Sequence, residues 1–424
     1  MTMSPAAAAP RMLPKSSEFM KHWTLDPEVV FLNHGSFGAC PKVVLEVQSE
    51  LRGLMEREPV RFFVELYDDL MYEARGELAK FVHVRDEDLV FVPNATTAVA
   101  TVLMNLEGSV KAGDELLATG HEYPACMNSM RRLAERTGAK VVSAPMPFPL
   151  KNPDEVVNAV MGAVSPRTRL LLISHVTSPS GLILPVEKIV PELEKRGIAV
   201  IVDGAHAPGF VSGLDVGKLG ASYYTANCHK WICSPKGSAF LHIREDKQKG
   251  AGGFRPLALS NFAEKNKPGR KHLLTEFDYI GTGDITAHLG IPAAIKFMGS
   301  LVPGGWSENM KRNRELVLKA RQVLCGELGV EAPAPESMIG STSTIFLPPH
   351  DAARNARLMA RPSKHHDALQ DALIGRHRIQ VPVWSIAGDG RRLFRVSGQM
   401  YNSMEQYEYL AQALKEELER ERGM

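Results

Sequence analysis

Short apolar runs alternate with helical patterns along the chain from about residue 88 onward. The runs are rich in leucine and β-branched residues, and they are continuously apolar, as expected for parallel strands that helices cover on both faces. This alternation predicts an α/β fold with a mainly parallel sheet sandwiched by helices. We expect strands at residues 89–92, 115–118, 140–142, 169–173, 198–202 and 239–243.

The alternation loosens beyond about residue 299, where Pro303-Gly304-Gly305 marks a break. Helical patterns at 306–328 and 404–422 then surround short strands at 343–347 and 393–397. At 424 residues the chain is also longer than one core usually organises. We therefore expect a disordered lead at 1–18, an N-terminal segment at 19–40 that joins the small domain, a large domain at 41–299 and a smaller α+β domain at 300–424.

Polar and small residues follow three of the predicted strands. Asn94-Ala95-Thr96-Thr97 follows the strand at 89–92, the segment from His175 to Gly181 follows 169–173, and Asp203-Gly204-Ala205-His206 follows 198–202. Open α/β sheets bind ligands at the carboxyl ends of their strands. A site assembled from several loops is implied.

The composition narrows the functional classes. Hydrophobic residues make up 44% and charged residues 23%, and the formal net charge is +2 without a long run of either sign, so nucleic acid and anionic membrane receive no support as partners. The five cysteines are scattered and odd in number, which indicates reduced thiols. Since the first residues lack the apolar core of a secretory signal, we expect a cytoplasmic protein.

Lys230 is the strongest candidate for chemistry. It lies between His229 and Trp231 in a segment that has neither a helical pattern nor a charge run, although a single lysine is usually a surface residue. Asp203 ends a wholly apolar strand, where an unpaired carboxylate would be costly. A cationic cofactor ring could be its partner, and an opposite charge in contact shifts a pKa by about 1–3 units; Asp203 could equally cap the next helix.

Three further segments carry weaker signals. Asn94-Ala95-Thr96-Thr97 precedes an apolar helical stretch, so it could bind phosphate at a helix N-terminus or merely cap the helix. His121-Glu122-Tyr123-Pro124 could place an aromatic ring over a planar ligand or in the core. The adjacent His365 and His366 point in different directions, so we favour a helix surface over a metal site and expect no metal.

These segments, in this order, resemble the class V aminotransferase family of pyridoxal 5'-phosphate enzymes of fold type I, and more narrowly the branch that contains isopenicillin N epimerase. The resemblance runs from about residue 30 to residue 400. It is carried by Phe31 to Gly38, Asn94 to Ala98, His121 to Tyr123, His175 to Gly181, Asp203 to His206, His229-Lys230-Trp231, Gly281 to Asp284 and Arg395-Val396-Ser397.

The resemblance implies a role for each matching residue. Lys230 would bind the cofactor as an imine and shuttle the substrate α-proton, Asp203 would pair with the pyridine nitrogen, His206 would lie near the ring hydroxyl and Tyr123 would stack on the ring. Further cofactor contacts would come from Ala95, Thr96, Thr177, Asn227 and His229. Arg395 would take the substrate carboxylate, Asn33 would line the substrate mouth, and Thr282 would reach the cofactor phosphate of the other subunit in a homodimer with shared active sites.

The resemblance leaves the reaction open. Epimerisation at the α-carbon of an amino acid is our first interpretation, with C–S β-elimination, transamination and a non-catalytic ligand-binding protein as alternatives. No cysteine follows Cys325, so the loop before Arg395 lacks the persulfide cysteine of related desulfurases. Persulfide chemistry is therefore disfavoured. Asn227 also stands where those enzymes commonly carry serine, which is a second departure from their pattern.

Overall fold

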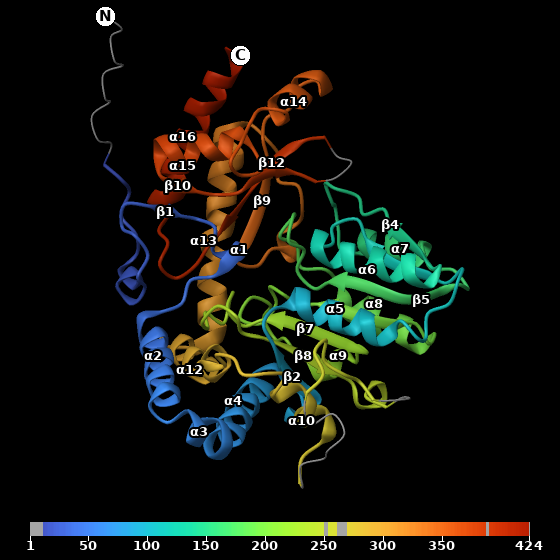
Figure 1. Ribbon diagram of the computed structural model, residues 1–424. Coiled ribbons are helices and arrows are strands. Elements are labelled where there is room, and N and C mark those ends of the chain that lie inside the picture. Colours follow the sequence, from blue (N-terminus) through green and yellow to red (C-terminus); the bar gives the residue numbers. More distant parts are fainter. Residues whose placement is uncertain (1–11, 250–252, 261–268, 387–389, 424) are drawn as a thin grey trace, which may run out of the picture.

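The computed structural model describes residues 12–249, 253–260, 269–386 and 390–423. Its centre is a seven-stranded sheet with the strand order β2-β8-β7-β6-β5-β3-β4, and helices cover both faces (Figure 1). All neighbours in this sheet run parallel except β8, which is antiparallel to both β2 and β7. The strands are β2 (Leu89–Val92), β3 (Glu115–Thr119), β4 (Lys140–Ala144), β5 (Thr168–Ser174), β6 (Ala199–Asp203), β7 (Tyr223–Asn227) and β8 (Ala239–Ile243).

The predicted α/β fold is confirmed, and each of the six expected runs forms a strand. Along β5, Leu170 and Leu172 belong to one hydrophobic core, whereas Leu171 and Ile173 belong to the other. Successive side chains of a strand point to opposite faces, and here both faces are covered, so all four central positions of β5, 170–173, are apolar. This explains the continuous runs in the sequence.

Two groups of helices form the two cores. Helices α5 (Ala95–Leu106) and α6 (Pro124–Thr137) pack in one core, and α4 (Tyr67–Val82), α7 (Asp154–Gly162) and α8 (Val186–Lys195) pack in the other. The strongest apolar stripe is in α8, where Val186, Ile189, Val190 and Leu193 are buried at helical spacing. The sheet is thereby held as a rigid platform for the loops at its edge.

A second, antiparallel sheet has the order β11-β12-β9. Its strands are β9 (Thr342–Phe346), β11 (Val383–Ser385) and β12 (Arg392–Ser397). The long helices α13 (Gly305–Leu328) and α16 (Met404–Arg422) pack against each other beside it, in agreement with the two predicted helical patterns (Figure 1). The remaining helices are α1 (His34–Phe37), α2 (Lys42–Arg57), α3 (Pro59–Arg61), α9 (Val216–Leu219), α10 (His272–Asp278), α11 (Thr286–Leu289), α12 (Ile291–Ser300), α14 (Ala352–Met359) and α15 (Ala368–His377).

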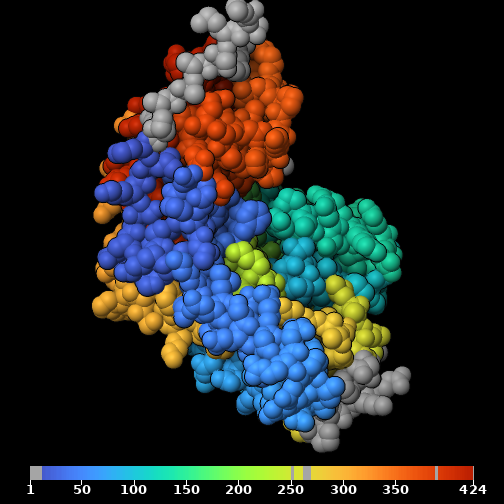
Figure 2. Space-filling model, turned by 60° about the vertical axis from the view of Figure 1, so that its left-hand side comes forward, coloured from blue at the N-terminus to red at the C-terminus, as the bar shows by residue number. Residues whose placement is uncertain are grey.

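The N-terminal segment joins the C-terminal part of the chain. Strand β1 (Val30–Phe31) pairs in parallel with β10 (Ile379–Gln380), and the blue segment runs along the red and orange C-terminal part in Figure 2. Ser17 also donates hydrogen bonds to the carbonyls of Tyr401 (3.1 Å) and Met400 (2.5 Å). These contacts differ from the disordered lead predicted up to residue 18; residues 1–11 lie outside the described ranges, and the domain boundaries stay predictions.

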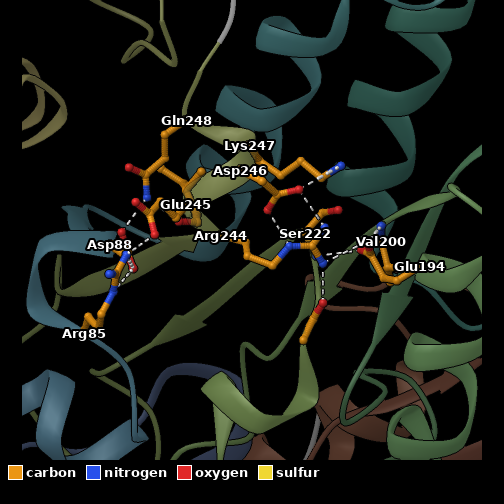
Figure 3. A network of polar contacts seen from close by, with 12 residues as sticks. Arg85, Asp88, Glu194, Val200, Ser222, Arg244, Glu245, Asp246, Lys247 and Gln248 are labelled. Atoms are coloured by element: carbon orange, nitrogen blue, oxygen red, sulfur yellow. Dashed lines mark hydrogen bonds and ion pairs between the residues drawn. The ribbon is translucent and has the colours of Figure 1, made fainter.

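Polar contacts and ion pairs link the strands of the large sheet at the end where β6 and β7 begin and β8 ends (Figure 3). Arg244, just beyond β8, binds Glu194 at 3.0 Å and Asp246 at 2.6 Å. The other oxygen of Glu194 accepts from the backbone N–H groups of Val200 and Ser222 near the starts of β6 and β7. A carboxylate shared between an arginine and two backbone donors fixes the spacing of these strands.

Within the described ranges, no helix is long and apolar enough to cross a membrane.

Candidate active site

Lys230 lies in the loop between β7 and β8, at the carboxyl edge of the large sheet. Its Nζ atom is 3.0 Å from Nε2 of His206, and the indole of Trp231 donates to Nδ1 of the same histidine at 3.4 Å. Burial lowers the pKa of Lys230 to about 8, and the positive charge of Arg395 acts in the same direction. A lysine with a lowered pKa has a larger share of nucleophilic amine near neutral pH.

Asp203 is the last residue of β6 and is 4% exposed. Its carboxylate accepts from the N–H of Ala205 at 3.0 Å and from the thiol of Cys126 at 3.5 Å. Burial raises the pKa of Asp203, although the nearby Lys230 and these donors oppose the rise. The alternative role as a helix cap is wrong, because the next helix, α9, is capped by Asp215.

The start of α5 forms another wall of the site. Asn94 caps this helix by accepting from the N–H of Thr97 at 2.8 Å, and Asn227, at the end of β7, accepts from the N–H of Ala95 at 2.9 Å. His229 lies nearby with its Nδ1 3.1 Å from the carbonyl of Ser238, so Nδ1 carries the proton and Nε2 is left for a ligand. A helix N-terminus beside a histidine suits a phosphate group.

Arg395, on β12, supplies a cation from the second sheet. Its guanidinium donates to the carbonyl of Ser178 and, at 3.1 Å, to the hydroxyl of Ser36, and it lies 5.2 Å from the centre of the Trp384 ring. Its Nε is buried without a hydrogen-bond partner among the described residues. An orphaned donor of this kind indicates that an acceptor is missing, as a substrate carboxylate would be.

These groups surround one cavity of about 370 Å³. Ser178, Val176 and Ser36 also line it. Of the residues predicted for the site, those that line the cavity are Lys230, Asp203, His206, Tyr123, Ala95, Thr96, Asn227, His229 and Arg395. The cavity is thus built from the segments that follow five strands of the large sheet (β2, β3, β5, β6 and β7), from β11 and β12 of the small sheet, from the segment before α15 and from the N-terminal segment.

Three predicted residues do not line this cavity. Asn33 instead contacts a residue of the lining, because its Oδ1 accepts from the Ser36 hydroxyl at 2.6 Å. Thr177 is buried, and its hydroxyl is 2.7 Å from Ser180 and accepts from the N–H of Leu182, so its neighbour Ser178 faces the cavity instead. Thr282 is exposed elsewhere, 2.7 Å from the hydroxyl of Tyr279. The geometry of this turn determines that Ser178 and not Thr177 faces the cavity, and the sequence pattern does not specify that geometry.

Three aromatic residues of the cavity were not predicted as site residues: Phe37, His366 and Trp384. The helix-surface interpretation of His365 and His366 is wrong, because α15 begins only at Ala368 with Asp367 as its cap. The ring of His366 lies edge-on to Trp384, with 6.0 Å between the ring centres. The two histidines do point apart, since His365 binds Asp371, and the described residues hold no metal-binding group of three ligands.

The N-terminal segment fixes the loop that carries Lys230. His34 is fully buried and its Nε2 is 3.0 Å from the carbonyl of Lys230. Gly38 approaches the same loop so closely that a Cβ atom would lie 1.9 Å from the carbonyl oxygen of His229. Only glycine fits there, which explains the glycine at this position of the motif.

The residues fit pyridoxal 5'-phosphate, the cofactor that the resemblance implied. The cavity holds an amine near a buried carboxylate, with a helix N-terminus for an anionic group and a free guanidinium donor for a second anion. These are the groups that the aldehyde, the ring nitrogen, the phosphate and a substrate carboxylate would need.

Comparisons with known proteins agree with this geometry. The family model "Aminotransferase class-V" matches residues 29–410. The chain is 36% identical to isopenicillin N epimerase of Amycolatopsis lactamdurans over 93% of this chain and 96% of that protein. It is 30% identical to a probable chloroplastic L-cysteine desulfhydrase of Arabidopsis thaliana over 94% of this chain and 84% of that one.

Solved structures share the fold. A mutant of C-DES with glycine covalently linked to its PLP cofactor superposes with a TM-score of 0.73 at 21% identity, over 91% of this chain and 96% of that chain. The apo cysteine desulfurase of Thermococcus onnurineus NA1 gives 0.70 at 21% identity, over 97% and 99%. The predicted fold type, family and cofactor are confirmed. The chain therefore belongs to the class V aminotransferase family of pyridoxal-phosphate enzymes.

Proposed function

We propose that this protein is an epimerase that inverts the α-carbon of an amino acid or of an amino-acid-derived substrate, with pyridoxal 5'-phosphate bound to Lys230. One observation carries the proposal: Lys230, Asp203 and Arg395 all line the same cavity. The relative named isopenicillin N epimerase, 36% identical, supports this reaction over the others.

The cofactor, when bound, supplies an electron sink that acidifies the α-hydrogen of an attached amino acid. Asp203 would hold the ring nitrogen in its cationic form, because a buried carboxylate favours a positive partner. Asn94 and Thr96, at the start of α5, would hold the phosphate with His229, and Ala95 would line the phosphate pocket, since its N–H already donates to Asn227. Asn227 would contribute indirectly by holding the first residue of α5 in place, since its side chain accepts from the N–H of Ala95.

The protein's own side chains would position the substrate and move its proton. Arg395 would bind the α-carboxylate, which fixes the bond that must break. Lys230 would remove the α-proton, and a base with a pKa of about 8 is well matched to that task near neutral pH. Inversion also needs a proton donor on the other face, and we assign this role to Tyr123, which lines the same cavity.

A second candidate is a C–S β-lyase, supported by the relatives named L-cysteine desulfhydrase. In that reaction Lys230 alone could handle the proton, and a sulfur leaving group would depart from the β-carbon. No cysteine is among the described residues that line the cavity, so a persulfide on the protein is not part of this candidate.

Incubation with amino acids in deuterated water separates the two reactions. Epimerisation predicts α-deuterium in a product of inverted configuration, whereas β-elimination predicts pyruvate and a thiol from cysteine-derived substrates. Aliphatic L-amino acids, which have no β-leaving group, are the control. If neither product forms with any amino acid tested, both candidates are wrong.

We also propose a cytoplasmic homodimer with shared active sites. All five cysteines are free thiols, as expected in a reducing compartment. Thr282 is exposed and is not among the residues that line the cavity of its own chain, which leaves it available to a second subunit. Mixed dimers of Lys230→Ala and Thr282→Ala subunits test this arrangement: sites that use only their own chain would contradict it.

A further inference from the structure

The hydrogen bonds around His206 determine where its proton lies. His206 is 3% exposed, and burial together with the charge of Lys230 lowers its pKa well below the usual value, so the ring is neutral and carries one proton. The indole of Trp231 can only donate, and it points at Nδ1 from 3.4 Å. Nδ1 therefore accepts, and the single proton lies on Nε2.

This tautomer fixes the state of Lys230. The N–H at Nε2 of His206 faces Nζ of Lys230 at 3.0 Å. An ammonium group has three donors and no acceptor, whereas a neutral amine has a lone pair that can accept. The pair of contacts is therefore complete only when Lys230 is the free amine.

Trp231 is packed tightly, so its indole N–H stays directed at Nδ1 of His206. It is 1% exposed, and its ring packs against His34 at 4.7 Å and edge-on to Phe210 at 5.1 Å. The charged groups that face Lys230 are Arg395, which also favours the neutral amine, and Asp203, which opposes it. Among the other ionisable groups nearby, Cys126 makes the smallest contribution and favours the ammonium form of Lys230. His34 and His229 are neutral, because burial lowers their pKa values to about 3 and about 4.

We propose that Trp231 is a positioning residue that places the proton of His206 on Nε2 and thereby shifts Lys230 toward the free amine that captures the cofactor. In capture, the nitrogen lone pair bonds to the aldehyde carbon, and the carbonyl oxygen leaves as water with both amine hydrogens, so that one C=N bond remains. An ammonium group cannot begin this step. The inference rests on the proposed anchoring role of Lys230.

The rate of cofactor capture as a function of pH tests the inference without any turnover. Cofactor-free protein is mixed with pyridoxal 5'-phosphate, and the growth of the yellow absorbance is followed. In Trp231→Phe the ring remains but the donor is lost, so His206 can accept from an ammonium. We expect the midpoint of the rate profile to rise by about one pH unit and capture to slow about tenfold well below both midpoints.

Trp23→Phe is the matched control, because Trp23 is 2% exposed and its indole donates to the carbonyl of Ala39, away from Lys230. Its midpoint should equal that of the wild type. Coincident midpoints for Trp231→Phe and the wild type would overturn the inference. A wild-type protein that never becomes yellow would instead overturn the anchoring role of Lys230.

Nitrogen NMR of the cofactor-free wild type provides a measurement that does not depend on the Trp231 variant. With 15N-labelled histidine, and His206→Gln to identify the signal, we expect the proton of His206 on Nε2. A proton on Nδ1 would contradict the inference directly.

Discussion

Gly38→Ala is expected to displace the loop that carries Lys230. Gly38 has φ 69° and ψ 168°, a backbone region that is essentially confined to glycine and costs other residues about 1–3 kcal/mol. The added Cβ would also lie 1.9 Å from the carbonyl oxygen of His229 and 3.0 Å from Cα of Lys230. Because non-bonded atoms at such positions rarely approach within about 3.3 Å, the His229 carbonyl must move by more than about 1 Å.

The magnitude follows from both effects. Backbone strain and overpacking together should lower the free energy of unfolding by about 2–5 kcal/mol. Since a displacement of about 1 Å near the reacting atoms can cost on the order of 100-fold, cofactor capture by Lys230 should slow by a similar factor. Gly213→Ala is the control, because Gly213 has the same φ of 69° but no atom within 4 Å of the added Cβ.

Denaturant unfolding and the appearance of yellow absorbance measure the two effects separately. Gly213→Ala should lose only the strain energy and should capture the cofactor at the wild-type rate. If Gly38→Ala behaved like Gly213→Ala in both measurements, the close approach of the N-terminal segment to the Lys230 loop would be wrong.

Three further substitutions test individual roles. Asp203→Asn should keep the cofactor but lower kcat about 10- to 1,000-fold, because the carboxylate shifts the ring-nitrogen pKa by about 1–3 units; an unchanged kcat would contradict the pairing. Arg395→Lys should raise KM about 10- to 100-fold and leave the yellow absorbance intact, because lysine cannot make the paired hydrogen bonds of guanidinium. In the cofactor-free protein, Lys230→Met should raise stability below pH 8, where the folded state penalises the ammonium. The pKa of Lys230 is about 8 in the fold against 10.5 outside it, so the gain should reach up to about 3 kcal/mol and vanish above about pH 10.5, as pH-dependent denaturation can show.

The sequence predicted the groups that lie at the ends of strands. Asp203 and Lys230 stand next to long apolar runs, and the carboxyl ends of parallel strands meet at one edge, so local patterns suffice to bring them together. The strand that precedes Lys230, β7 (Tyr223–Asn227), was not delimited, because its polar Thr225 and Asn227 interrupt the apolar run. Both side chains are nonetheless buried and hydrogen-bonded.

Contacts between distant segments were beyond the sequence pattern. His366 resembled a solvated helix surface because its neighbours are polar, and only the approach of Trp384 brings it into the cavity wall. Arg395 was placed by resemblance, but its contacts with Ser36 and Ser178 join segments hundreds of residues apart. Such contacts depend on how the two sheets pack, which periodicity does not encode.

The central claim is that the amine of Lys230 carries the cofactor, and peptide mapping tests it most directly. Borohydride reduction of the yellow protein, followed by digestion and mass spectrometry, locates the lysine that bears the phosphopyridoxyl group. We expect the added mass on the peptide at Lys230. Addition at another lysine, such as Lys236, whose amine donates to the carbonyl of Gly38 at 3.0 Å, would contradict the account.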